Sequence, residues 1–347
     1  MVDKARIAGG VVNMLEVNLG VKAGEKLLVM SDVPTDEEWL ESESDRLMHF
    51  LERSVLGKAV GEIASERISE VRTEFYPFPS TGKSGTEPLP EVAQRMKRAD
   101  LIVAITSHSL SHTDAREGAT RAGARVASMP GFLEEMFYPE GPMTVDYDAV
   151  AVEATRLADL MTDVEKVGVR SSGGTDIEFS LKGRRARPDT GLYRMRGEWG
   201  NLPAGEAYVA PLEGSAEGRI VVEVGWYPGL REEMSIVLRR GIVDEIEGGG
   251  DVGDRFRSLL RVDERDEPYL SRRNLAELGV GVNPRARRTD NILEAEKIRG
   301  TVHLAVGDNA HFGGRVKADT HNDFVIPKPD LTLDGVKLME RGKLFVT

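Results

Sequence analysis

The sequence predicts two domains: a doubly wound α/β domain followed by a mostly antiparallel β-rich domain. Two observations predict this fold class. Residues 1–164 alternate short apolar runs with stretches of helical periodicity, which is typical of parallel strands joined by right-handed crossovers. From residue 165 onward, apolar and polar residues alternate between turn residues, which is typical of antiparallel hairpins. We therefore predict a Rossmann-like α/β domain over residues 1–164 and a β-rich domain over residues 165–347.

In the first half, the alternation of strands and helices can be followed in order. The predicted strands cover residues 26–30, 71–76, 100–105 and 125–129. The predicted helices cover residues 8–20, 39–64 in one or two pieces, 91–98, 113–122, 132–137 and 145–161. After Asp100, the run at 100–105 is apolar throughout, as expected of a strand that is buried on both faces of a parallel sheet.

Two loops of this half contain residues that suggest binding. Gly82-Lys83-Ser84 resembles part of a phosphate-binding loop, but Pro77 stands where that motif needs glycine, so we predict a flexible loop. Residues 106–113 form a serine-rich loop with His108 and His112, after the strand at 100–105. Open α/β sheets bind ligands at this end of a strand, so the loop is a candidate ligand site. We do not predict a metal there, because no carboxylate accompanies the two histidines at ligand spacing.

The second half reads as a series of short strands. The predicted strands cover residues 167–170, 175–181, 220–224, 234–238 and 241–246, and residues 251–260 are compatible with a helix. The basic cluster at 184–187 is short, and we interpret it as a solvated loop.

Composition excludes several classes of function. The 347 residues contain no cysteine, which excludes disulfides, thiolate metal ligands and a cysteine nucleophile. The net charge is −12 and no long basic run occurs, so we expect no nucleic-acid partner. No apolar stretch is long enough for a membrane span, and the N-terminus lacks a signal-peptide core, so we expect a cytoplasmic protein without membrane contact.

The stretch from residue 300 to 325 holds three of the six histidines. His321 and Asp323 are two residues apart, so on a strand both side chains leave the same face. His303 lies on a preceding strand that a glycine-rich connection can fold back beside them. An imidazole and a carboxylate that point together suit a metal ion, although this stretch alone is equally compatible with structural histidines.

Two glutamates add to this set. Glu206 stands between a Pro/Gly turn and an apolar strand, and Glu277 stands in an apolar run that glycines interrupt. Taken singly, each is compatible with a surface residue at a turn, but a buried carboxylate is costly unless it is paired or bound to metal. With His303, His321 and Asp323 they make five nitrogen and oxygen ligands, a number that suits two divalent ions sharing a carboxylate.

At these residues the chain resembles the M29 (thermophilic) aminopeptidases. The resemblance rests on residues 201–206 (Asn-Leu-Pro-Ala-Gly-Glu), the Glu277 segment, residues 303–307 and residues 321–323. Residues 174–179 resemble the start of that family's second domain, and residues 20–25 agree more loosely.

The resemblance implies a metal-dependent aminopeptidase, which is a hydrolase. Glu206, Glu277, His303, His321 and Asp323 would hold two divalent ions (Zn, Co or Mn), with Glu206 as the candidate bridge. A metal-activated water would attack the N-terminal peptide bond of a peptide substrate. The resemblance also implies that the β-rich domain carries the metals and that the protein is a homodimer.

The sequence departs from this family at one position, and two other functions stay open. The peptidases carry a tyrosine shortly after the first ligand histidine, whereas residues 304–314 contain no tyrosine. Tyr208 and His311 are the candidates to replace that tyrosine. We therefore assign no catalytic residue. The chain also looks similar in fold to the ring-cleaving dihydroxypyridine dioxygenases, in which His303, His321 and Asp323 would hold one Fe(II). In that group the first histidine falls nearer the position of Glu277. The third alternative is a metal-binding relative without activity.

Overall fold

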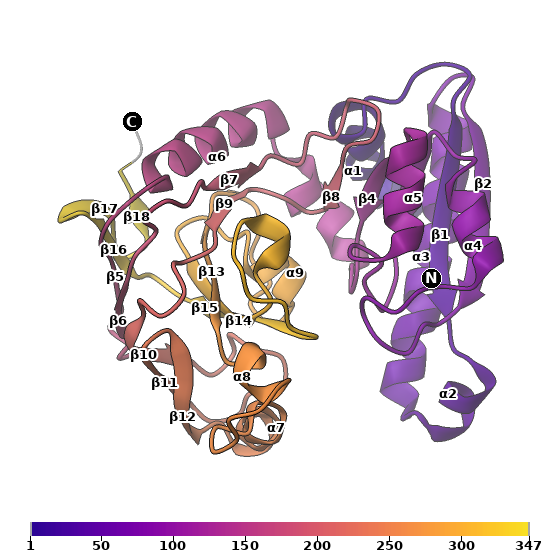
Figure 1. Ribbon diagram of the computed structural model, residues 1–347. Coiled ribbons are helices and arrows are strands. Elements are labelled where there is room, and N and C mark those ends of the chain that lie inside the picture. Colours follow the sequence, from indigo (N-terminus) through magenta and orange to yellow (C-terminus); the bar gives the residue numbers. More distant parts are fainter. Residues whose placement is uncertain (1, 346–347) are drawn as a thin grey trace. The chain divides into compact units, whose positions relative to one another are not determined.

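A five-stranded parallel sheet forms the centre of the first part of the chain in this computed structural model, which describes residues 2–345 (Figure 1). Its strand order is β2-β1-β3-β4-β8, and every neighbouring pair is parallel. The strands are β1 (Lys26–Val33), β2 (Arg72–Pro79), β3 (Leu101–Ala104), β4 (Arg125–Ser128) and β8 (Trp199–Asn201).

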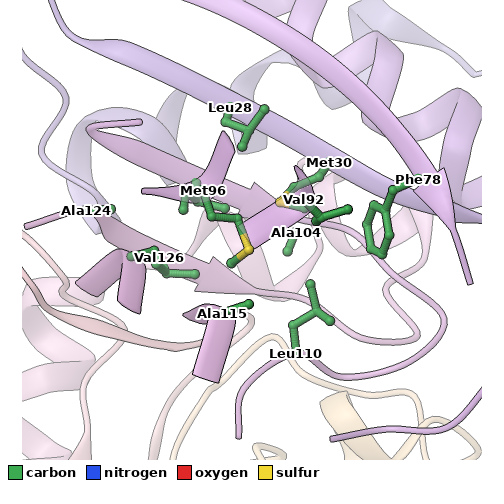
Figure 2. Packing of buried hydrophobic residues seen from close by; sticks show 12 residues of the cluster. Leu28, Met30, Phe78, Val92, Met96, Ala104, Leu110, Ala115, Ala124 and Val126 are labelled. Atoms are coloured by element: carbon green, nitrogen blue, oxygen red, sulfur yellow. The ribbon is translucent and has the colours of Figure 1, made fainter. Parts of the chain in front are cut away.

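The residues of β1 alternate between two helical layers. On one face, Leu28 and Met30 join a buried cluster with Val92 of α4 and Ala115 of α5 (Figure 2). On the other face, Gly61 of α3 approaches Val29, because a β-carbon at Gly61 would lie 3.9 Å from that side chain. Helices on both faces of a parallel sheet explain why its strands read as continuous apolar runs.

The predicted helices are present in the predicted order with shifted ends, except that the helix predicted at 132–137 is a 3-10 turn; α8 and α9 were not predicted. The helices are α1 (Lys4–Asn13), α2 (Asp36–Glu41), α3 (Ser44–Arg67), α4 (Pro90–Met96), α5 (Asp114–Ala122), α6 (Tyr147–Met161), α7 (Gly250–Leu260), α8 (Tyr269–Arg272) and α9 (Ile292–Ala295). A π-helical segment η1 (Met14–Asn18) extends α1, and 3-10 turns are η2 (Glu134–Phe137), η3 (Pro142–Thr144) and η4 (Ala310–Phe312).

Two antiparallel sheets make up the second part. The eight-stranded sheet has the order β12-β11-β10-β6-β5-β16-β17-β18, and the five-stranded sheet has the order β15-β14-β13-β9-β7. The eight-stranded sheet comprises β5 (Val167–Arg170), β6 (Asp176–Phe179), β10 (Glu217–Val222), β11 (Met234–Arg239), β12 (Ile242–Gly248), β16 (Asp330–Leu333), β17 (Val336–Glu340) and β18 (Lys343–Leu344). The smaller sheet comprises β7 (Arg187–Asp189), β9 (Glu206–Val209), β13 (Leu275–Gly281), β14 (Val302–Gly307) and β15 (His321–Ile326).

The predicted fold class is confirmed: an α/β part precedes a mostly antiparallel β-rich part. The compact units are not continuous in sequence, however. The first comprises the chain up to Asp148 together with Gly191–Ala204, and the second comprises Ala149–Thr190 and the chain from Gly205. The predicted division lay at residue 164, after α6. Here most of α6 belongs to the second unit, and the segment 191–204 belongs to the first, where it adds β8 beside β4. A three-residue strand around Gly200 is too short to show a periodicity.

Within residues 2–345, we find no helix that combines the length and the apolar character needed to cross a membrane.

The buried cluster beside β1 generates a stability prediction. Leu28→Ala should lower the free energy of unfolding by about 2–5 kcal/mol, because it leaves a cavity in a packed core where Leu28 is 3% exposed. Leu40→Ala, at a leucine that is 87% exposed, is the matched control and should change that free energy by less than about 0.5 kcal/mol. Urea unfolding of both variants measures the difference, and equal values would contradict the packing described for β1.

Candidate metal centre

The strand register places all five predicted ligands on one face of the smaller sheet. His303 pairs with Gly279 across β13 and β14, and Asp323 pairs with Ala305 across β14 and β15. Glu206 of β9 pairs with Gly281 of β13. Directly paired residues share a face and every second residue of a strand points the same way. By the same rule, the face also carries Glu277, His321, Tyr208 and Asp189.

Glycines on this face make room for the larger side chains. A β-carbon at Gly279 would lie 2.0 Å from Nε2 of His303, so the imidazole occupies the space of the missing side chain. A β-carbon at Gly281 would lie 2.3 Å from the carbonyl oxygen of Ile298 and 2.7 Å from that of Glu296. The segment after α9 therefore lies directly against β13 and brings Glu296 and Lys297 to the face (Figure 1).

Glu277 lies between the two imidazoles. Its Oε1 is 3.5 Å from Nε2 of His303, and its Oε2 is 3.1 Å from Nε2 of His321. Nε2 of His321 is also 3.4 Å from Oδ1 of Asp323. Glu277 thus contacts both imidazoles.

The backbone fixes the orientation of the His321 ring. Nδ1 of His321 lies 2.8 Å from the carbonyl oxygen of Asp308, which can only accept a hydrogen bond. Nδ1 therefore carries a hydrogen, and Nε2 is left to face Glu277 and Asp323. A second-nitrogen hydrogen bond of this kind is typical of histidines that bind metal through Nε2.

A buried lysine lies on the other side of His303. Nζ of Lys297 is 2.6 Å from Oε1 of Glu206, 3.0 Å from Oε2 of Glu296 and 3.9 Å from Oδ2 of Asp189. Oε2 of Glu206 faces Nε2 of His303 at 3.3 Å but makes no hydrogen bond, and Nδ1 of His303 is also without one. Neither Lys297 nor Glu296 was predicted from the sequence.

The charges on this face shift one another's pKa values. Burial opposes ionisation of His303, yet the carboxylates of Glu206 and Glu277 raise the pKa of His303 to about 9. Burial also opposes the charge on His321, but Asp323 and Glu277 raise its pKa well above the usual value. Burial raises the pKa of Glu296 to about 8, although Lys297 lowers it. Without a metal, the imidazoles thus act as cations for the carboxylates.

The donor atoms fall into two groups. Glu277, His321 and Asp323 each offer one atom to a shared position, and Glu206, Glu296 and His303 form a second group; within each group the atoms lie within 4.8 Å of one another. His303 belongs to the second group, so the alternative set of His303, His321 and Asp323 is not the one that the structure gathers. The structure brings all five predicted residues together, and their binding of metal stays a prediction.

The remaining candidates do not belong to these donor groups. His311 is largely exposed, with Nε2 3.7 Å from Oδ2 of Asp308. Tyr208 stacks edge-on against Phe312, whose ring stacks edge-on against His321 at 5.7 Å. Burial raises the pKa of Tyr208, and the nearby carboxylate of Asp189 adds to the shift, so its hydroxyl stays protonated. In the first unit, the backbone N–H groups of Ser107 and His108 donate to the buried Asp32 at 2.7 and 3.2 Å.

A family model and a curated relative of this chain name the same family. The family model NicX, described as 2,5-dihydroxypyridine 5,6-dioxygenase, matches residues 13–346. The 2,5-dihydroxypyridine 5,6-dioxygenase of Pseudomonas putida is 26% identical over 268 residues, which are 72% of each chain. The solved 2,5-dihydroxypyridine dioxygenase of the same organism superposes with a TM-score of 0.72 at 18% identity, covering 100% of this chain and 99% of that one. AmpT from Thermus thermophilus gives a TM-score of 0.61 at 15% identity, covering 99% and 100%.

These comparisons correct the predicted activity. The family model and the curated relative name a dioxygenase, so the predicted aminopeptidase function and the hydrolase class are wrong. The resemblance to the M29 peptidases holds for the fold, since AmpT is a thermophilic M29 aminopeptidase. The dioxygenase family implies a single Fe(II) rather than two Zn, Co or Mn ions. The predicted homodimer and the absence of a nucleic-acid partner stay predictions.

The contact between Gly279 and His303 can be tested by one added methyl group. Gly279→Ala should lower the free energy of unfolding by about 1–3 kcal/mol and weaken binding of a divalent ion, because the methyl group must displace the His303 ring. Gly9→Ala is the control, since a β-carbon there meets nothing within 4 Å. Urea unfolding and Mn²⁺ titration measure both effects. Unchanged stability and affinity in Gly279→Ala would contradict the close packing.

The raised pKa of His303 predicts how the metal-free protein responds to pH. A group whose pKa is raised by folding stabilises the protein below its unfolded pKa, about 6.5 for histidine, and loses that contribution as pH rises through the folded value. Between pH 6.5 and about 9, stability in the presence of a chelator should therefore fall. His303→Gln should flatten this fall, whereas His49→Gln, at an exposed histidine, should leave it intact. Equal slopes in the two variants, measured by urea unfolding, would refute the assignment.

Proposed function

We propose a function from one premise: this chain belongs to the 2,5-dihydroxypyridine 5,6-dioxygenase family. The proposed reaction is cleavage of a hydroxylated aromatic ring, of the 2,5-dihydroxypyridine kind, with incorporation of both atoms of dioxygen. The family match over residues 13–346 is the observation that carries this proposal. The proposed cofactor is a single Fe(II) held by Glu277, His321 and Asp323.

The three side chains fit a divalent ion. Metal–ligand bonds of about 2.0–2.2 Å at angles of roughly 90–110° separate neighbouring donor atoms by about 2.8–3.6 Å. Nε2 of His321 lies 3.1 Å from Glu277 and 3.4 Å from Asp323, within that range. The set differs from the usual two histidines and one carboxylate of Fe(II) oxygenases, because Glu277 supplies an oxygen in place of one imidazole. Carboxylate oxygen and imidazole nitrogen both suit Fe(II).

The surroundings of this group support an aromatic substrate. The ring of Phe312 is partly exposed and stands edge-on to His321, and Tyr208 stands edge-on to Phe312 with ring centres 5.8 Å apart. Aromatic side chains offer flat apolar surfaces on which a planar ring can pack face-on or edge-on. Phe312 and Tyr208 would therefore bind and orient the ring beside Glu277, His321 and Asp323.

The roles of the chain's own groups follow from their contacts. When bound, Fe(II) supplies the redox chemistry by which dioxygen reacts with the ring. The Asp308 carbonyl holds Nε2 of His321 toward the centre, and Glu277 and Asp323 supply negative charge there. The Tyr208 hydroxyl keeps its proton, because burial and neighbouring carboxylates raise its pKa, so it can donate a hydrogen bond to a substrate oxygen but not remove a proton.

Oxygen uptake tests the proposed function. Protein loaded anaerobically with Fe(II) should consume one dioxygen per molecule of 2,5-dihydroxypyridine, with loss of the ring absorbance. His321→Ala and Asp323→Ala should each lose both iron and activity, because each removes one of three donors. His49→Ala is the matched control at an exposed histidine.

Two results would contradict the proposed function. One is iron-loaded protein that is inert toward dihydroxylated pyridine and benzene rings. The other is full iron content in both ligand variants, determined by metal analysis of the purified proteins.

A further inference from the structure

A lysine ammonium lies among the carboxylates that would otherwise form a second cation site. Lys297 is 3% exposed, and its Nζ contacts Oε1 of Glu206 and Oε2 of Glu296 at 2.6 and 3.0 Å. Oδ2 of Asp189 follows at 3.9 Å. Lys297 thus takes oxygen atoms from two of the three members of the Glu206–Glu296–His303 group.

The backbone holds this lysine in place. The carbonyl oxygen of Lys297 accepts a hydrogen bond from the backbone N–H of Asn283 at 2.9 Å, and Gly281 allows the segment to lie directly against β13. Burial disfavours the charge on the ammonium, but Glu206, Glu296 and Asp189 raise the pKa of Lys297 well above its usual value. The ammonium of Lys297 thus lies among three carboxylates on this side of the centre.

The two groups of donors consequently differ in their balance of charge. On the side of Glu277, His321 and Asp323, the carboxylates contact the imidazoles of His303 and His321, which can themselves be metal ligands. On the side of Glu206, a fixed ammonium lies where a divalent ion would have to share the same carboxylates. Two cations a few ångströms apart in a buried site repel strongly.

We propose that Lys297 is the built-in cation of the Glu206–Glu296–His303 group and limits this centre to one divalent ion. The inference rests on the metal centre of the proposed function and deepens it, because it assigns a reason for single occupancy to one residue. Without the ammonium, Glu206, Glu296 and His303 become a vacant donor set for a second divalent ion. Glu277 contacts both His303 and His321, so the two ions would then share its carboxylate.

Mn²⁺ binding to the full-length chain tests this inference without reference to activity. Metal analysis after equilibrium dialysis should give one Mn²⁺ per wild-type chain and two per Lys297→Met chain. Electron paramagnetic resonance should show an isolated Mn²⁺ in the wild type and an exchange-coupled pair in Lys297→Met. Lys297→Arg keeps the charge and should stay at one ion.

A second neutral variant keeps the test usable if Lys297→Met does not fold. Lys297→Gln keeps a hydrogen-bond donor near Glu206 and should also bind two ions; circular dichroism checks that each variant is folded. Two Mn²⁺ in the wild type, or one in both neutral variants, would overturn the role of Lys297. Absence of Mn²⁺ from the wild type would instead overturn the metal centre on which the inference rests. If both neutral variants failed to fold, two Mn²⁺ in the wild type would still overturn the role of Lys297.

Discussion

The centre depends on the concentration of acidic groups on one buried sheet face. Glu206 and Glu277 are buried there, and Asp189, Glu296 and Asp323 are largely covered. Carboxylates removed from water are costly unless opposite charges or hydrogen bonds compensate them. Among the side chains of the protein, His303, His321 and Lys297 provide that compensation. When a divalent ion binds, it can replace the protons of the two imidazoles.

This arrangement requires small residues at defined positions of the sheet. Gly279 lies opposite His303, Ala305 opposite both Glu277 and Asp323, and Gly307 opposite His321. A larger side chain at Gly279 would occupy the space of the imidazole. The face therefore combines long ionisable side chains with small residues at these paired positions, which lets the donor atoms converge. The glycines interrupt the apolar pattern of the strands because the site needs that volume.

The fold alone does not decide the reaction. The chain superposes on a dihydroxypyridine dioxygenase and on AmpT, with TM-scores of 0.72 and 0.61. Both likenesses show the same architecture, and function depends on the groups at the site. The aminopeptidase prediction depended on the histidine and carboxylate residues found in the strands. Those types suit hydrolytic and oxygen-dependent metal chemistry alike, whereas the family match over nearly the whole chain distinguishes the two.

The sequence by itself determined the order of α/β and β-rich parts and the identity of five residues that converge. The period-two spacing of His321 and Asp323, and acids placed in apolar runs, are local signals that survive in any fold of those strands. Only the tertiary structure decided which of the five form a group, that Glu277 rather than Glu206 contacts both imidazoles, and that Glu296 and Lys297 join them. Those facts depend on strand register and on the segment after α9 lying against Gly281, contacts between residues distant in sequence that no local pattern encodes.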